Sequence, residues 1–254
     1  MDDELNSDSS NFWSKSWKDK IIIVAVSAMA IGQWADTKSM AEALYVGVFS
    51  NFTHKYEYEN LNRVNVGANL TYVEQTLGSP QLIKKSKYID NIKFNYYLNK
   101  KYILTLIHKE KRVLGYSIIS LVEDFVPNDL ITKNEMKNKQ IVSHFYSEVS
   151  DFTVDYNNVK LILTQEELDK NNLFLNKFSG SIGYLDYLNL DSAELKHLYD
   201  ALNNEMSDYN VEKGIEQITN KAINNFYGVG EINLSVIADS ILTDFEYSLY
   251  YQKI

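Results

Sequence analysis

The sequence predicts an α+β protein. An amino-terminal hydrophobic helix is followed by a small helix packed on an antiparallel meander and by a mixed α/β carboxy-terminal part. Three observations predict this class. Residues 21–34 form a long run without a charged side chain. Residues 62–120 combine a capped amphipathic segment with three short segments of strand-like pattern. Residues 140–254 mix helix-capping patterns with short apolar segments.

Composition excludes several classes of function. The chain has 254 residues, a formal net charge of −9 and no cysteine. A net acidic chain argues against non-specific nucleic-acid binding, which needs clustered lysine and arginine side chains. Without cysteine there are no disulfides, thiolate metal sites or cysteine nucleophiles. The fraction of hydrophobic residues is 45%, which is ordinary for a globular protein.

The first two predicted segments are a disordered tail at residues 1–11 and a hydrophobic, then amphipathic, helix at residues 12–52. Tryptophan and lysine side chains directly before the apolar run are typical of a membrane interface. The run is shorter than the roughly 20 apolar residues that a full span requires. Three interpretations therefore stay open: a membrane anchor, a core or oligomer-interface helix, and a signal peptide.

The membrane interpretation assigns roles to particular residues of this segment. Small side chains would let neighbouring helices approach closely, which makes Ala25, Ala28 and Gly32 the candidate contacts of a homo-oligomer. The candidate anchor residues, which would contact membrane lipid, are Trp13, Trp17, Lys18, Lys20, Ile21, Ile22, Ile23, Val24, Val26, Met29, Ile31 and Trp34. The predicted location is the bacterial inner membrane, with a single pass.

Residues 60–122 are predicted to form a small α+β unit. Asn69 is the expected N-cap of a two-turn helix, and Gly78 and Pro80 end it. The segments at residues 92–98, 102–108 and 113–121 are expected to be strands, joined by short charged turns. Together they predict a small helix packed on an antiparallel meander.

This order resembles the SmpA/OmlA (BamE-like) unit of bacterial envelope lipoproteins. The resemblance rests on Val-x-Val-Gly at residues 64–67, Leu-Gly-x-Pro at residues 77–80, and the strands that follow. It implies a role as an envelope scaffold or assembly factor. The lipid-bearing cysteine of those lipoproteins is absent. The order of a hydrophobic helix and such a unit also resembles single-pass bacterial proteins, some of them associated with phage defence.

The region at residues 140–254 is predicted to be a carboxy-terminal α+β part. Thr164–Glu167 and Asp191–Glu194 have the pattern of helix N-termini. Residues 180–183 and 227–230 are glycine-rich and predict turns. The alternating segment Phe245–Tyr251 is expected to be an edge strand.

No motif predicts catalysis, a cofactor or a metal. The four histidines have no metal-ligand spacing, and neither a P-loop nor a nucleophile elbow occurs. Clustered tyrosines can stack ligands or line an interface, although tyrosine also favours strands. Tyr96, Tyr97 and Tyr102 are therefore the candidate surface for a small-molecule or protein partner.

Three functions follow. The first is a membrane-anchored, oligomeric, non-enzymatic protein whose folded domain senses a ligand or partner. That domain would control a membrane helix bundle, as an effector or pore does, for instance in anti-phage defence. The second is an envelope scaffold or assembly factor with its domain outside the cytoplasm. A soluble enzyme is the third, and no motif supports it.

Overall fold

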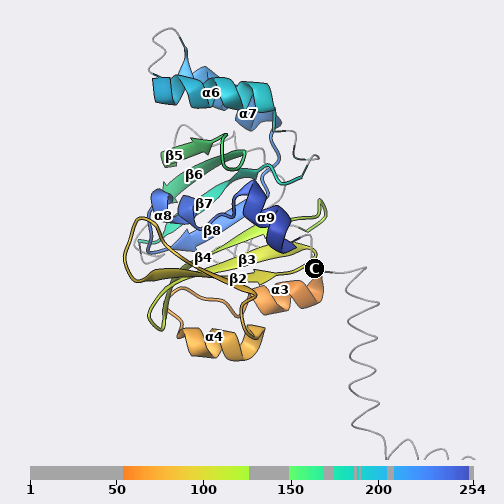
Figure 1. Cartoon of the computed structure of the whole chain (residues 1–254), viewed down its shortest axis with the longest axis vertical. Helices are drawn as coiled ribbons and strands as arrows, with labels where there is room; N and C mark the ends of the chain where they lie inside the picture. The colour runs from red at the N-terminus through yellow and green to blue at the C-terminus, as the bar shows by residue number, and fades with distance from the viewer. Residues whose placement is uncertain are drawn as a thin grey trace, which may run out of the picture. The chain divides into compact units, whose positions relative to one another are not determined.

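The computed structural model describes residues 54–125, 149–168, 174–185, 188, 190–204 and 209–251. Helices and strands alternate irregularly along these ranges (Figure 1). The helices are α3 (Lys55–Leu61), α4 (Leu70–Leu77), α6 (Ser192–Asn204), α7 (Val211–Lys221), α8 (Leu234–Asp239) and α9 (Asp244–Tyr251). The strands are β1 (Leu82–Lys85), β2 (Ile92–Leu98), β3 (Tyr102–Lys109), β4 (Arg112–Ser120), β5 (Val149–Asp155), β6 (Leu161–Glu167), β7 (Asn176–Ile182) and β8 (Phe226–Gly230).

All eight of these strands belong to one sheet. Their order is β1-β2-β3-β4-β8-β7-β6-β5, and every neighbouring pair is antiparallel. Strand β8 joins a four-stranded meander, β1 to β4, to a three-stranded meander, β5 to β7. The predicted fold class is therefore wrong: the expected meander is only part of a large sheet, because β8 covers the edge that β4 would otherwise expose.

The local elements of the first meander nevertheless lie where the sequence places them. The Asn69 side chain accepts a hydrogen bond from the backbone N–H of Thr71 and caps α4. Gly78 ends the helix with φ of +82°, a conformation that favours glycine. Strand β2 occupies the expected range, and β3 and β4 differ from theirs by one residue. Capping and alternation depend on neighbouring residues, so sequence reasoning finds them.

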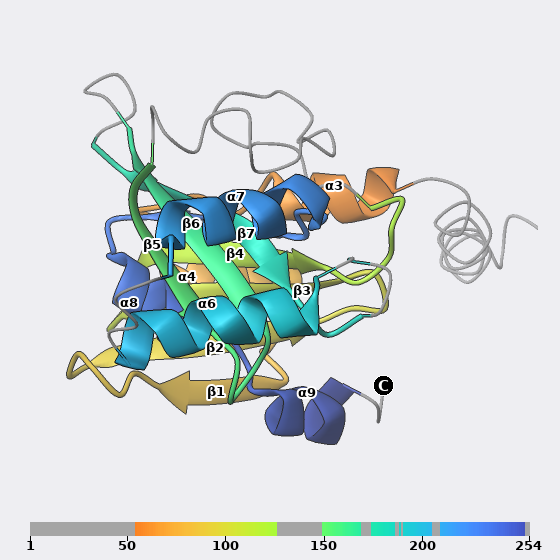
Figure 2. The same cartoon turned by 90° about the horizontal axis from the view of Figure 1, so that it is seen from above.

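Helices cover both faces of the sheet (Figures 1 and 2). One face packs against α8 and α9 and contains the largest of the three hydrophobic clusters that the described residues form. On the opposite face α4 covers the β2–β4 end, and α6 and α7 cover the β5–β6 end. The core beneath α8 includes Phe94, Ile107, Leu163, Phe178, Phe226, Val236 and Ile237. The opposite face buries Leu70, Val73, Leu104, Ile118 and Tyr227 near α4, and Ile162, Leu195, Leu198, Ile215 and Ile218 near α6 and α7.

Several predictions for the carboxy-terminal part are also wrong. Thr164–Glu167 is the end of β6 rather than a helix start, and residues 180–182 and 227–230 lie in strands β7 and β8. The segment expected as an edge strand is the helix α9. Tyr247 and Tyr251 lie one helical turn apart and stack on each other, and Tyr247 also stacks on Tyr184, which lies outside the helix. These tertiary contacts outweigh the strand preference of tyrosine.

The membrane prediction also needs correction. Among the described residues, no helix has both the length and the apolar character needed to cross a membrane. This finding contradicts the predicted single-pass location in the inner membrane, which is not retained. The eight-stranded sheet likewise contradicts a BamE-like architecture. The predicted tail at 1–11 and helix at 12–52, with all their anchor and oligomer-contact residues, lie outside the described residues.

Candidate functional site

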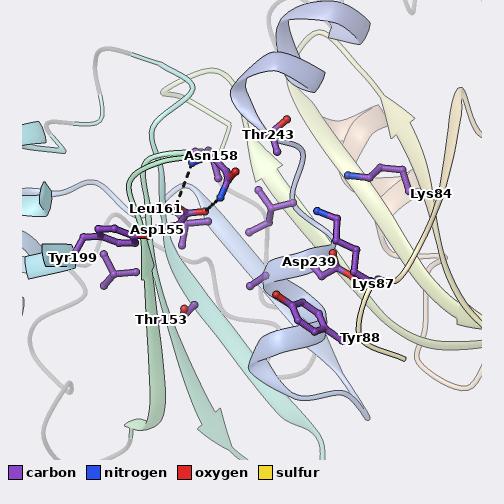
Figure 3. Close-up of a pocket in the computed structure, with 14 residues that line it drawn as sticks. Lys84, Lys87, Tyr88, Thr153, Asp155, Asn158, Leu161, Tyr199, Asp239 and Thr243 are labelled. Carbon is purple, nitrogen blue, oxygen red and sulfur yellow. Dashed lines mark hydrogen bonds between the residues drawn. The ribbon is translucent and has the colours of Figure 1, made fainter. Parts of the chain in front are cut away.

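A cavity of about 250 Å³ lies on the α8 face of the sheet (Figure 3). Its walls come from both edges of the sheet. Lys84 belongs to β1, Lys87 and Tyr88 follow it, and Thr153 and Asp155 belong to β5. These two strands stand first and last in the sheet order. The sheet therefore curves around α8 until its two edges face one space.

The side of the cavity next to β1 is held by Asp239 at the end of α8. Its Oδ2 accepts hydrogen bonds from Ser86 Oγ at 3.0 Å and from the Lys87 backbone N–H at 2.7 Å. Ser86 Oγ in turn accepts from the backbone N–H groups of Tyr88 and Ile89, both at 3.2 Å. One carboxylate thus fixes the chain between β1 and β2 against α8.

The side next to β5 is a tight turn organised by Asp155. Its Oδ1 accepts from the backbone N–H groups of Asn157 at 2.8 Å and Asn158 at 3.2 Å, and its Oδ2 accepts from Asn158 Nδ2 at 2.9 Å. Asparagine and aspartate side chains commonly close turns in this way. Asn157 Nδ2 also donates to Tyr199 Oη at 2.8 Å, which ties the turn to α6.

An ion pair joins β1 to α9 beside the cavity. Lys84 Nζ lies 2.8 Å from Glu246 Oε2, and both side chains are mostly buried. The Thr243 backbone N–H also donates to Glu246 Oε2 at 2.9 Å. Burial by itself raises the pKa of Glu246, but these hydrogen bonds and the Lys84 charge bring the pKa below its ordinary value. Glu246 is therefore ionised at neutral pH, and it neutralises Lys84.

The tyrosines expected to form a ligand surface lie in the core. Tyr96, Tyr97 and Tyr102 are 0%, 6% and 6% exposed. Tyr96 Oη donates to the Ser240 carbonyl at 2.8 Å, and burial raises its pKa well above the ordinary value. Tyr102 stacks on Phe125. Burial and the nearby Glu74 raise the pKa of Tyr97 to about 12, and its hydroxyl has no hydrogen-bond partner among the described residues.

The hydroxyls of Tyr96 and Tyr97 predict opposite effects of the same substitution. Tyr96→Phe removes a satisfied hydrogen bond and should lower the free energy of unfolding by about 1–2 kcal/mol. Tyr97→Phe removes a hydroxyl that is buried without a partner, so it should leave stability unchanged or raise it by up to about 1 kcal/mol. Urea denaturation of the two variants measures the difference. Equal losses would contradict this account of the two side chains.

Sequence reasoning missed the residues that line the cavity. Lys87, Tyr88, Asp155, Tyr199 and Asp239 come from four distant parts of the chain. The Asp155-Tyr156-Asn157-Asn158 run is a turn signal that the sequence does contain. Nothing local indicates that this turn faces Lys87, because that proximity depends on the curvature of the whole sheet.

Comparisons with known proteins give little guidance. No family model matches the chain, and no curated protein matches it. A solved structure with some similarity is an extracellular protein containing an SCP domain from Bacillus anthracis str. Ames. The two chains are 10% identical, with a TM-score of 0.28, over 74% of this chain and 46% of the other. A similarity this low carries no argument about fold or function.

Proposed function

We propose that this chain is a non-catalytic binding protein that takes a small ligand into the cavity between the two edges of its sheet. The observation that carries the proposal is the position of Tyr88 and Thr153, from opposite ends of an eight-stranded sheet, around one cavity. A ligand there contacts both edges at once. Its binding would therefore stabilise the curved form of the sheet, so the shape of the protein would change with the bound fraction of the cavity.

The size and lining of the cavity support a small polar ligand. Pockets for drug-sized molecules have volumes of roughly 300–1,000 Å³, and this cavity lies just below that range at about 250 Å³. Polar side chains such as Lys87, Asn158 and Asp239 surround an apolar base that includes Leu161 and Ile241. An apolar base with a few converging polar groups is the usual composition of a binding site.

Binding is favoured over catalysis because the carboxylates near the cavity have structural partners. Both oxygens of Asp155 accept hydrogen bonds from its own turn, and Asp239 Oδ2 holds the chain after β1. Glu246 is paired with Lys84. The pore and effector roles expected from the sequence required the helix at residues 12–52, which lies outside the described residues, so the proposal rests on binding alone.

A ligand-observed NMR screen of the full chain against small polar metabolites tests the proposal. We expect binders whose signals disappear in Ala238→Phe, which fills the cavity, and persist in Tyr72→Ala, which changes an exposed ring on α4 outside the cavity. Thr153→Leu is a second blocking variant if Ala238→Phe does not fold. The proposed function would be refuted if the screen found no binders. It would also be refuted if the binding signals persisted in both blocking variants.

A further inference from the structure

We infer that the ligand of this cavity is a neutral polyhydroxylated molecule, a sugar residue of about hexose size. The inference rests on the proposed binding function and names the chemical class that the cavity would select. It follows from the charges around the cavity, from its uncommitted hydrogen-bonding groups, and from its apolar surfaces.

The charges around the cavity disfavour an ionic ligand. Glu246 already neutralises Lys84. Lys87 Nζ makes no ion pair or hydrogen bond within the described ranges, and Asp239 and Asp155 contribute negative charge to the same space. An anion attracted by Lys87 would meet the carboxylates of Asp239 and Asp155, and a cation attracted by these carboxylates would meet the Lys87 ammonium group. No group of acidic or histidine side chains suited to a metal ion occurs among the described residues. A neutral ligand avoids these repulsions.

The uncommitted polar groups include donors and acceptors together. Lys87 Nζ and the hydroxyls of Tyr88 and Thr153 can donate. Tyr199 Oη already accepts from Asn157, so its own proton is available to a ligand. Asn158 Oδ1 and Asp239 Oδ1 can accept, because the hydrogen bonds of these side chains within the described residues use Asn158 Nδ2 and Asp239 Oδ2. A sugar hydroxyl donates and accepts at the same oxygen, so a ring of hydroxyls suits such a mixed lining.

Aromatic and aliphatic surfaces complete the match. Tyr88 and Tyr199 lie on opposite sides of the cavity (Figure 3). Tyr88 is 68% exposed, although it is a large aromatic side chain. A sugar ring has C–H faces that pack on aromatic rings while its hydroxyls point to polar groups around the rim. Val159, Leu161 and Ile241 supply the apolar base. A small aliphatic amino acid such as alanine would use the charged groups but not these two ring surfaces.

Saturation-transfer NMR of the full chain, with phosphorus-31 line broadening for inorganic phosphate, tests the inference with named probes. These are glucose, galactose, mannose and N-acetylglucosamine, with L-alanine and inorganic phosphate as ionic comparisons. We expect at least one sugar to bind at millimolar concentration and both ionic probes to give no signal. Tyr88→Ala should weaken sugar binding by about tenfold through the lost ring contact. Lys87→Gln should weaken sugar binding several-fold, because it removes the ammonium group of Lys87. The main-chain hydrogen bond of residue 87 to Asp239 stays in place, so the wall of the cavity should not change.

Lys85→Gln is the matched control. Lys85 is an exposed residue of β1 next to Lys84, does not line the cavity, and should bind sugar like the unchanged chain. Binding of L-alanine or phosphate in place of the sugars, lost on Tyr88→Ala, would overturn the sugar assignment and leave the proposed function standing. If Tyr88→Ala and Lys87→Gln do not weaken sugar binding, the assignment to this cavity is overturned. It is also overturned if none of the six probes binds. The wider metabolite screen decides the proposed function separately.

Discussion

Asn225→Ala is expected to lower the free energy of unfolding by about 3–4 kcal/mol, because it removes a set of buried hydrogen bonds from one side chain to the backbone. Asn225 is 4% exposed and directly precedes β8. Its Oδ1 accepts from the Ile182 N–H at 2.8 Å. Its Nδ2 donates to the Ile182 carbonyl at 3.1 Å and to the Ser120 carbonyl at 3.4 Å. One side chain therefore joins the ends of β4 and β7, where the two meanders meet.

Urea denaturation measures the loss, and Asn203→Ala is the matched control. The Asn203 side chain donates to the Tyr199 carbonyl of its own helix and is exposed. Its removal should cost less than about 0.5 kcal/mol. A similar cost for the two alanine substitutions would show that Asn225 does not hold the junction of the meanders.

Gly180→Ala is expected to cost more than about 3 kcal/mol, because β6 and β7 would have to move apart. A Cβ at residue 180 would overlap the carbonyl oxygen of Ile162 and lie 2.8 Å from Leu163 Cδ2. The carbonyl belongs to the backbone of the neighbouring strand, so no side-chain rotation relieves the overlap. The added methyl group would disrupt the sheet on the α8 face.

Gly228→Ala separates this effect from a general preference for glycine in the sheet. A Cβ there would meet only side chains, with Ile237 Cδ1 at 3.2 Å and Phe178 at 3.4 Å. These side chains can shift slightly, so the expected cost is about 1 kcal/mol or less. Thermal or urea unfolding of both variants gives the comparison. Equal costs would contradict the close approach of β6 and β7 at Gly180.

Sequence reasoning succeeded where structure depends on neighbouring residues. The helix between Asn69 and Gly78 and the three strands after it were predictable, because caps, turns and alternation are local signals. The same reasoning mistook Thr164–Glu167 for a helix start. In the structure Glu166 lies across from Lys177 on β7 and forms a 3.0 Å ion pair with it. The partner strand, which the local pattern does not contain, decides the outcome.

The candidate site could not be predicted for a related reason. The tyrosine clusters predict a ligand surface at Tyr96 and Tyr97, but the positions of these residues on β2 bury them in the core. Tyr88 is the exposed tyrosine that lines the cavity, and it is isolated in the sequence. Its relation to Thr153 arises only when eight strands pair in one order and the sheet curves. Such long-range closure leaves no periodic signal in either segment.

Chemical cross-linking across the cavity tests most directly whether the two edges of the sheet meet there. The chain has no cysteine, so Tyr88→Cys with Thr153→Cys places the only two thiols on opposite walls. A short bismaleimide should link them rapidly within one molecule, and a metabolite that occupies the cavity should slow the reaction.

Lys85→Cys with Thr153→Cys is the control, because Lys85 is exposed and does not line the cavity. We expect intramolecular linkage for the first pair at a much higher rate than for the control. Equal rates, or linkage only between molecules, would contradict it.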